Sequence, residues 1–509
     1  MKNIKKILVI VLCTALVFAM VSCGAEAQAE TAGNGAESIR AAVGSGGIYD
    51  MNEDNTETIS SLTYGAVKPA LGYGELYPEL ESALEEYCAD VQETVTADYD
   101  ELAESARNES QGDVFFGPYV LKETMTVRRA DSNVFSILTG TYYYGGGAHG
   151  YSAYSGATFN SKTGEQLKLS DIVSDGAMLQ EKVQEQLDRW YSETEFYATL
   201  DGYFDDLDSD TIAWTLDRYG LTIYFNQYDL APYASGIQVV TVPYEGNEAL
   251  FSGDWSDSPE TCGAQLALGV PYYTDLDGDG EQDQVTVTGW TDEYGAYDTL
   301  MITVNETTTQ LEIYSYDLLP MLIHTSAGTN GLYVQLTAEN DYRFIECFSL
   351  NSEAAEHVGT VGAGLESEYS EGDIRSFQNL LSGDNGEWLS GRVVLLGTTS
   401  GEKQYNIAAD GTLYSDDEYY KIITPLELTT KLDITSRTID GATGETTGNE
   451  YIIPAGTAVK WVRTDGSNTA DLELPDGETV RITLDNEGWP YTVDGIGIEE
   501  AFDGIVFAG

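Results

Sequence analysis

The segment that decides the fold prediction is ILTGTYYYGGGAHG, residues 137–150. It begins with β-branched and aromatic residues, which favour a strand. Three consecutive glycines follow, which allow the backbone to turn tightly, and residues 151–159 return to a strand-like composition. The segment therefore predicts two neighbouring strands joined by a glycine-rich turn that carries His149.

Helical periodicity appears on both sides of this segment. A helix is expected to begin near residue 78, and a second is expected over about 178–191, N-capped near Ser174 or Asp175. The first helix places apolar side chains at i, i+4 and i+7: Leu80, Leu84 and Tyr87. Strands are expected over 114–128, 221–225, 237–242, 458–462 and 479–484.

The N-terminus has the three parts of a signal peptide. Three lysines precede an apolar run over residues 7–20, which is too short to span a bilayer as a stable helix. Val21, Ser22 and Cys23 then resemble the lipobox of bacterial lipoproteins. The resemblance implies that Cys23 carries a lipid and that the chain is tethered to the extracytoplasmic face of a bacterial cell membrane. An ordinary secretory signal with a chance cysteine is the alternative.

The charge is strongly acidic, at −61 for the full chain. Nucleic-acid binding through phosphates is excluded, because those contacts need clustered Lys and Arg. A cationic partner or a divalent cation suits this charge, although an adaptation for solubility alone explains it too.

The segment at 142–150, followed by residues 159–171, resembles the extracytoplasmic domain of the RsiV family. The same region resembles the non-catalytic part of PdaC-type peptidoglycan deacetylases. The likeness covers about 51–255 and implies an α+β module that binds lysozyme, a cationic protein. It also implies that Tyr142, Tyr143, Tyr144 and His149 contact the ligand. For His149 the alternative is structural, with its ring bonded to backbone carbonyls that hold the loop.

The remaining features of those families are not visible in the sequence. A deacetylase metal site needs histidines and aspartates at short spacing, but His149, His324 and His357 lie far apart. The lipid at Cys23 stands where RsiV has a membrane span, so an anti-sigma role is unsupported.

An acidic loop at residues 275–283 predicts a structural Ca²⁺ site. Oxygen ligands at positions 1, 3, 5, 7 and 9 of a tight turn suit this hard cation. The proposed ligands are Asp275, Asp277, Asp279, Glu281 and Asp283. Position 12 is Thr286 where an EF-hand needs Glu, and the flanks alternate like a strand, so the loop resembles those of extracellular β repeats. An acidic turn that binds nothing is the alternative.

Three further features have weaker implications. A cluster of five aspartates is interpreted as a solvated loop: Asp201, Asp205, Asp206, Asp208 and Asp210. No disulfide framework is expected from the three cysteines Cys88, Cys262 and Cys347. A single Cys262–Cys347 bridge is the alternative. Trp489 either stacks on a ligand or belongs to the core.

The sequence thus predicts an α+β RsiV-like domain, a β-rich domain and a small β-barrel that resembles bacterial SH3-like modules. The expected divisions are a signal peptide at 1–22, a flexible tether at 23–50, and domains at 51–255, 256–420 and 421–509. The expected function is non-catalytic capture of a protein or cell-wall ligand, with lysozyme favoured. The alternatives are a peptidoglycan hydrolase that uses carboxylates and a structural spacer of the envelope.

Overall fold

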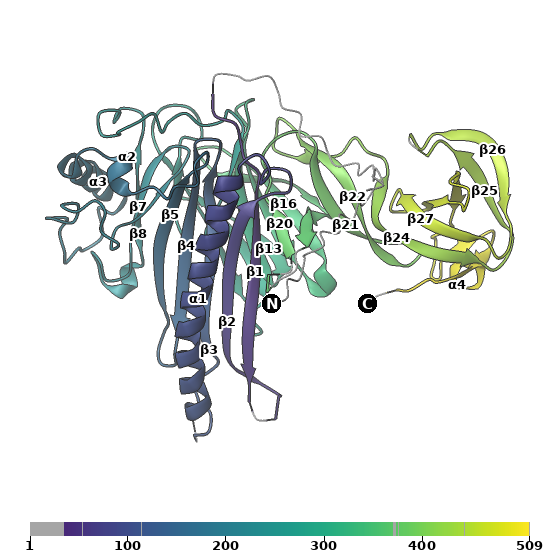
Figure 1. Cartoon of the computed structure of the whole chain (residues 1–509), viewed down its shortest axis with the longest axis horizontal. Coiled ribbons are helices and arrows are strands. Elements are labelled where there is room, and N and C mark those ends of the chain that lie inside the picture. Colours follow the sequence, from purple (N-terminus) through teal and green to yellow (C-terminus); the bar gives the residue numbers. More distant parts are fainter. Residues whose placement is uncertain are drawn as a thin grey trace, which may run out of the picture. The chain divides into compact units, whose positions relative to one another are not determined.

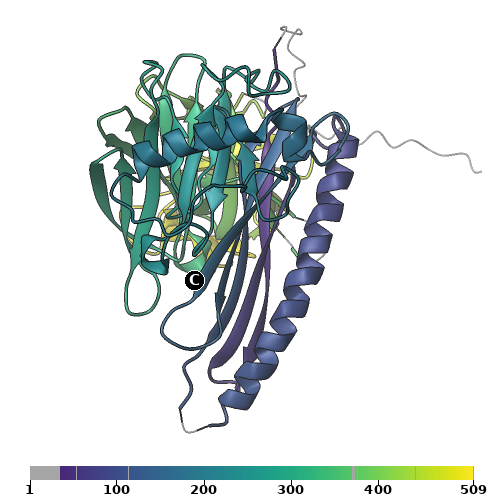
Figure 2. The ribbon, with the colours of Figure 1, turned by 90° about the vertical axis from the view of Figure 1, so that its left-hand side faces the viewer.

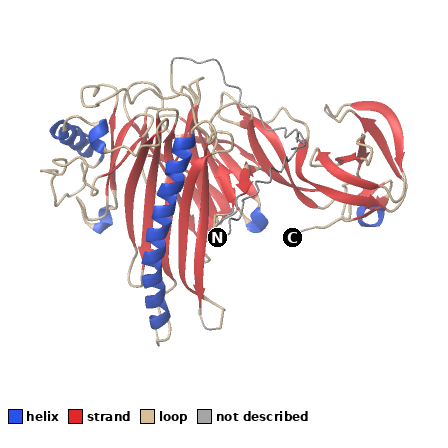
Figure 3. Cartoon of the chain, in the orientation of Figure 1, coloured by secondary structure: helices blue, strands red, loops and turns tan. Residues whose placement is uncertain are grey.

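The computed structural model describes residues 35–52, 54–112, 114–369, 373–374, 376–441 and 443–507. Strands make up 47% of the structure and helices only 13%, as the red and blue segments of Figure 3 show. The α+β class predicted from the sequence is therefore wrong. The predicted small SH3-like barrel is also wrong, because the sheets are not closed barrels. None of the described helices is long and apolar enough to cross a membrane.

The first sheet has seven strands in the order β19-β20-β1-β2-β3-β4-β5. Only β2 and β3 run parallel, and helix α1 (Pro78–Glu109) connects them as a crossover. The strands are β1 (Ala41–Met51), β2 (Thr58–Pro69), β3 (Tyr119–Ala130), β4 (Val134–Tyr144), β5 (Tyr151–Asn160), β19 (Ser367–Tyr369) and β20 (Ser376–Asn379). The predicted pair of strands around the glycine turn is β4 and β5.

Helix α1 lies along one face of this sheet (Figures 1 and 2). Its buried side chains recur at helical spacing and pack onto the strands, beginning with Leu80 and Leu84 and continuing through Tyr99 and Leu102. Proline in the first turn suits the helix start, because its missing N–H is not needed there. The helix predicted near residue 78 is confirmed, and it extends to Glu109.

Strand β1 lies mostly within residues 23–50, which were expected to form a flexible tether. Residues 23–34 lie outside the described residues, whereas 41–51 pair with β2 along their whole length. Strand β1 also pairs with β20, so one sheet joins the expected tether to residues 376–379. A Cβ at Gly44 would lie 2.6 Å from Ile374. The small residues that suggested a tether thus allow close packing of the strand.

A smaller unit of three strands and two helices follows. Its sheet is formed by β6 (Ala213–Leu216), β7 (Gly220–Phe225) and β8 (Gln238–Pro243). Helix α2 (Leu169–Ile172) precedes α3 (Gly176–Trp190), which buries Leu179, Val183 and Leu187 against this sheet. The Asp175 side chain caps α3 and is one of the two candidates that the sequence predicted, and the predicted strands at 221–225 and 237–242 are confirmed within a residue.

Two further sheets share one apolar core. The four-stranded sheet contains β10 (Tyr272–Thr274), β11 (Asp283–Thr291), β12 (Tyr297–Val304) and β13 (Thr307–Ser315). The five-stranded sheet contains β9 (Cys262–Gln265), β14 (Asp317–His324), β15 (Asn330–Thr337), β16 (Arg343–Leu350) and β17 (Ala355–Val361). Short 3₁₀ turns lie at Tyr233–Ser235 and Glu339–Asp341.

The C-terminal strands belong to an open eleven-stranded sheet. Strand β22 pairs with β24, with Gly401 opposite Ile422. The region expected as a separate barrel therefore continues the preceding sheet. Its strands are β18 (Gly364–Leu365), β21 (Glu387–Val394), β22 (Thr398–Ile407), β23 (Leu413–Tyr414), β24 (Tyr420–Thr430), β25 (Ile434–Ile439), β26 (Thr446–Ile453), β27 (Ala458–Thr464), β28 (Thr469–Glu473), β29 (Thr479–Thr483) and β32 (Phe502–Asp503). A hairpin of β30 (Thr492–Val493) and β31 (Ile496–Gly497) precedes the short α4 (Ile498–Ala501).

Candidate functional site

The end of the β4–β5 hairpin carries the tyrosines and the histidine singled out in the sequence. Tyr142 and Tyr143 are 39% and 45% exposed, and His149 is exposed in the turn. Successive residues of a strand face opposite sides, so Tyr142 and Tyr143 do not share a surface. The hydroxyl of Tyr144 donates to the carbonyl of Gly147 at 3.1 Å and braces the turn. The structure therefore does not bring all four predicted ligand residues onto one face.

His149 lies against a tyrosine from a distant part of the chain. Its ring stacks on Tyr233, with 3.9 Å between ring centroids and 25° between planes. Its Nδ1 and the hydroxyl of Tyr233 both donate to the carbonyl of Gly150, at 3.0 and 2.9 Å. The ring of Tyr142 lies over the same glycine, where a Cβ would come within 2.5 Å of it. The bond to the backbone agrees with the structural alternative for His149, and because the ring stays exposed, ligand contact stays a prediction.

Tyr228 extends this surface. It is 53% exposed and its ring centroid lies 6.0 Å from that of Tyr233. Its backbone has a φ of 73°, which a non-glycine residue adopts only when the surroundings hold it there. We call Tyr142, His149, Tyr228 and Tyr233 the aromatic patch. Sequence reasoning missed its last two members.

Side chains of the loop after β7 hold the aromatic patch together. Asn226 pairs with Tyr154 on β5 through both its amide groups, accepting at 2.6 Å and donating at 3.0 Å. Gln227 accepts a hydrogen bond from the backbone N–H of Ser152 at 3.1 Å. These amides replace a neighbouring strand along the edge of β5. The patch is thus fixed by contacts between segments that are distant in sequence, which no local pattern reveals.

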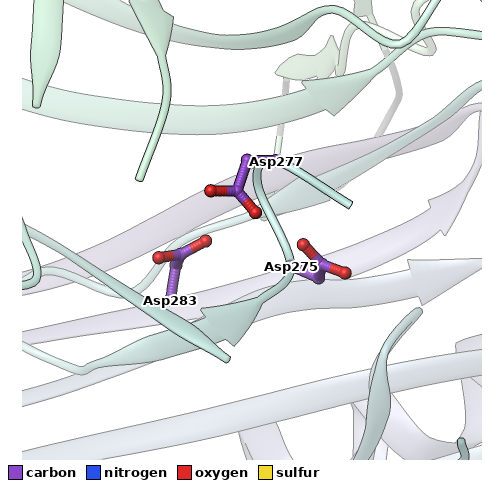
Figure 4. Close-up of side chains that lie close together, drawn as sticks. All are labelled: Asp275, Asp277 and Asp283. Atoms are coloured by element: carbon purple, nitrogen blue, oxygen red, sulfur yellow. The ribbon is translucent and has the colours of Figure 1, made fainter. Parts of the chain in front are cut away.

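The acidic loop brings three of its five predicted ligands together. One carboxylate oxygen from each of Asp275, Asp277 and Asp283 lies within 4.8 Å of the others, and Figure 4 shows the three side chains around a common space. This is the one such group of His, Cys, Asp or Glu side chains in the part of the chain that the structure describes. Asp279 instead accepts from the N–H of Glu281 at 2.8 Å, and Glu281 pairs with Arg189 at 2.8 Å.

The donor set of this loop suits a hard cation in part. Three carboxylates are the right chemistry for Ca²⁺, but that ion takes six to eight oxygens, so carbonyls or water would have to complete the shell. Both oxygens of Asp275 also accept loop N–H groups, from Gly278 at 2.6 Å and Gly280 at 2.9 Å. The loop is therefore pre-shaped by its own hydrogen bonds, and Ca²⁺ binding stays a prediction.

The other residues singled out in the sequence lie apart from these two places. The five aspartates at 201–210 are all exposed. Cys88, Cys262 and Cys347 are free, so the bridge left open between the last two is not formed. His357 bonds to Glu346 at 2.8 Å, and His324 bonds to Asn330 at 2.8 Å. Trp489 is 61% exposed and packs edge-to-face on Tyr491 and Phe507, so it does not belong to the core.

Comparison with known proteins finds two family models. Residues 73–152 match the model described as deacetylase PdaC, and residues 170–245 match one described as a protein of unknown function, DUF3298. The expected likeness to PdaC is thus confirmed for residues 73–152, whereas the likeness to RsiV stays a prediction. No curated protein matches.

Two solved structures are similar to part of the chain. One is a DUF3298 family member from Bacteroides fragilis NCTC 9343, with 22% identity, 43% of this chain covered, 96% of that chain covered and a TM-score of 0.32. Another is a DUF3298 family protein from Pseudomonas aeruginosa PAO1, with 15% identity, 43% and 98% coverage and a TM-score of 0.31. The family models alone make the chain similar to a PdaC-type segment over residues 73–152 and to a DUF3298 segment over residues 170–245.

Proposed function

We propose that this chain is a lipid-anchored, extracytoplasmic binding protein that captures a cationic protein ligand without catalysing a reaction, with lysozyme as the first candidate. The aromatic patch is the observation that carries the proposal. It combines three tyrosines and a histidine from the end of β4, its turn and the segment after β7, which hydrogen bonds hold in place. Exposed tyrosines on a rigid support supply large contact area at a low cost in side-chain entropy.

The composition supports a cationic partner. The net charge of −61 gives the chain a long-range field that attracts positive proteins and speeds their encounter. Screening by salt weakens that attraction beyond a Debye length of about 8 Å at physiological ionic strength. If charge attraction and contact with the aromatic patch both contribute to capture, added salt should weaken the binding but not abolish it.

The test is a pull-down of lysozyme at low and moderate salt with the full chain. We expect binding by the wild type and its loss in Tyr142→Ala and Tyr228→Ala. Tyr294→Ala is the matched control, because Tyr294 is 86% exposed and is not part of the patch. Absence of wild-type binding at both salt concentrations would sink the lysozyme proposal. Equal binding by all variants would show that charge alone attracts lysozyme.

The location is part of the proposal and is tested separately. Residues 1–23 lie outside the described residues. The proposed membrane anchor is supported by the lipobox-like sequence that ends at Cys23. A bound acyl chain adds about 0.8 kcal/mol of membrane affinity per buried methylene. We expect the wild type to enter the detergent phase of a membrane extract and Cys23→Ser to stay in the aqueous phase.

The proposed absence of catalysis has its own test, which is incubation of the chain with purified peptidoglycan. Release of fragments would contradict a purely binding role and favour a hydrolase.

A further inference from the structure

A cavity rich in arginine lies where the sheets meet, away from the aromatic patch. Its walls include Arg128 and Arg129 of β3, Arg218 of the β6–β7 turn and His324 at the end of β14. The space amounts to about 430 Å³ with open solvent included, but the room within it for a water-sized group is only about 20 Å³, so any ligand there must be small. Three arginines around one cavity are unexpected in a chain with 24 basic and 85 acidic residues.

Two of these arginines are neutralised by carboxylates. Arg128 makes two bonds to Asp217, at 2.7 and 3.1 Å, and both side chains are fully buried. Arg129 pairs with Asp131 at 2.6 Å and also donates to backbone carbonyls. Each pair cancels its own charge, so neither pair supplies the excess positive charge of the cavity.

Arg218 has no such partner. It forms no ion pair or side-chain hydrogen bond with any residue that the structure describes, and its Nε is buried. Arg128, which is 1% exposed, also has a buried Nη1 with no partner. An unpaired buried donor costs about 1–3 kcal/mol, and more when it is charged. Two such guanidinium donors beside one cavity, with one uncompensated charge, match what an anion would satisfy.

The lining also contains a row of polar side chains across three strands. Cys262 of β9 faces His324 of β14, which faces Asn330 of β15. The amide of Asn330 donates to the carbonyl of Leu276 at 2.8 Å, so its oxygen accepts from Nδ1 of His324 at 2.8 Å. This bond orients the imidazole. Burial is the largest cause that lowers the pKa of His324; the hydrogen bond to Asn330 opposes it, and the charge of Arg218 adds to the lowering.

We propose that this cavity binds a small oxyanion, held by the guanidinium group of Arg218 and the unpartnered Nη1 of Arg128, with His324 also in the lining. Guanidinium groups match the oxygens of phosphate, sulfate and carboxylate through parallel N–H donors. The proposal is independent of lysozyme capture, because none of these residues belongs to the aromatic patch.

The test is equilibrium dialysis of the full chain against inorganic phosphate, sulfate and acetate at constant ionic strength, with chloride as the balancing salt. Constant ionic strength is needed because any salt screens a net charge of −61. We expect saturable binding of at least one oxyanion at one per chain, weakened by about tenfold or more in Arg218→Gln. Arg437→Gln is the control, because Arg437 is exposed on β25.

Two results would overturn the proposal. The first is the absence of saturable binding of all three oxyanions to the wild type, which does not depend on any variant folding. The second is equal affinity in the wild type and Arg218→Gln. If Arg218→Gln does not fold, Arg218→Lys keeps the charge but loses the planar fork, and an unchanged affinity there would equally contradict the proposed guanidinium contact.

Discussion

The ring of His149 stacks on the ring of Tyr233 at a centroid distance of 3.9 Å, and both side chains donate to the carbonyl of Gly150. One residue lies in the PdaC-like segment and the other in the DUF3298-like segment. The contact therefore joins the two segments at the surface proposed to bind the ligand.

Replacing Tyr233 separates packing from hydrogen bonding at this contact. Tyr233→Phe keeps the stack and loses one hydrogen bond, which lowers the free energy of unfolding by about 0.5–1.5 kcal/mol. Tyr233→Ala also loses the aromatic pair, worth about 0.5–1.5 kcal/mol more. Chemical denaturation measures both. We expect lysozyme capture to survive in Tyr233→Phe and to fail in Tyr233→Ala, and the reverse order would contradict the role of the stack.

Glu123 makes stability depend on pH. This side chain of β3 is 2% exposed, one of its oxygens has no partner among the described residues, and burial raises its pKa to about 7. An acid whose folded pKa lies above its unfolded value of about 4.3 stabilises the fold when protonated, and that stability is lost as pH rises toward 7. We expect Glu123→Gln to match the wild type at pH 4 but to exceed it at pH 8 by on the order of 2–3 kcal/mol. Denaturation curves at both values measure the difference, and a pH-independent difference would contradict a buried acid.

Calcium should stabilise the acidic loop. The close carboxylates of Asp275, Asp277 and Asp283 repel one another, and a bound cation removes that repulsion. We expect Ca²⁺ to raise the melting temperature, since saturation at a hundred times Kd adds about 2.7 kcal/mol. Asp277→Ala should abolish the rise and Asp279→Ala should largely retain it, because Asp279 lies outside the trio. Mg²⁺ at equal concentration controls for screening, and an equal rise with both ions would argue against a specific site.

The buried pair of Arg128 and Asp217 should dominate stability at the junction of the sheets. Asp217 also accepts hydrogen bonds from Thr215 and Thr222, so its removal leaves several buried donors unpaired. We expect Asp217→Ala to cost about 3–5 kcal/mol of unfolding free energy. Asp50→Ala is the matched control, because its partner Arg107 is 55% exposed and such pairs contribute about 0–1 kcal/mol. Similar losses of unfolding free energy in both variants would contradict the dominant role of the buried pair.

Local patterns predicted the parts of the fold that local forces stabilise. The spacing of Leu80 and Leu84 predicted α1, the start of α3 was predicted near Ser174 or Asp175, and the turn at residues 145–150 separated β4 from β5. Strand β1 is not predicted because its alanines and glycines lack the apolar alternation of a strand. These small residues allow close packing, which becomes evident only when β2 and β20 pair with β1. The predicted fold class is wrong because α1 and α3 have a clear helical periodicity, whereas short strands leave only a weak alternating pattern in the sequence.

By itself the sequence determined the acidic charge, the glycine turn that carries His149 and the acidic loop at residues 275–283. A short run of residues is sufficient to predict the turn and the loop, but the structure decided that three of the five predicted ligands lie together. Only the tertiary structure decided that Tyr233 stacks on His149 and that Arg218 shares a cavity with Arg128 and His324. Those partners are distant in sequence, and packing between sheets brings them together, which no local pattern encodes.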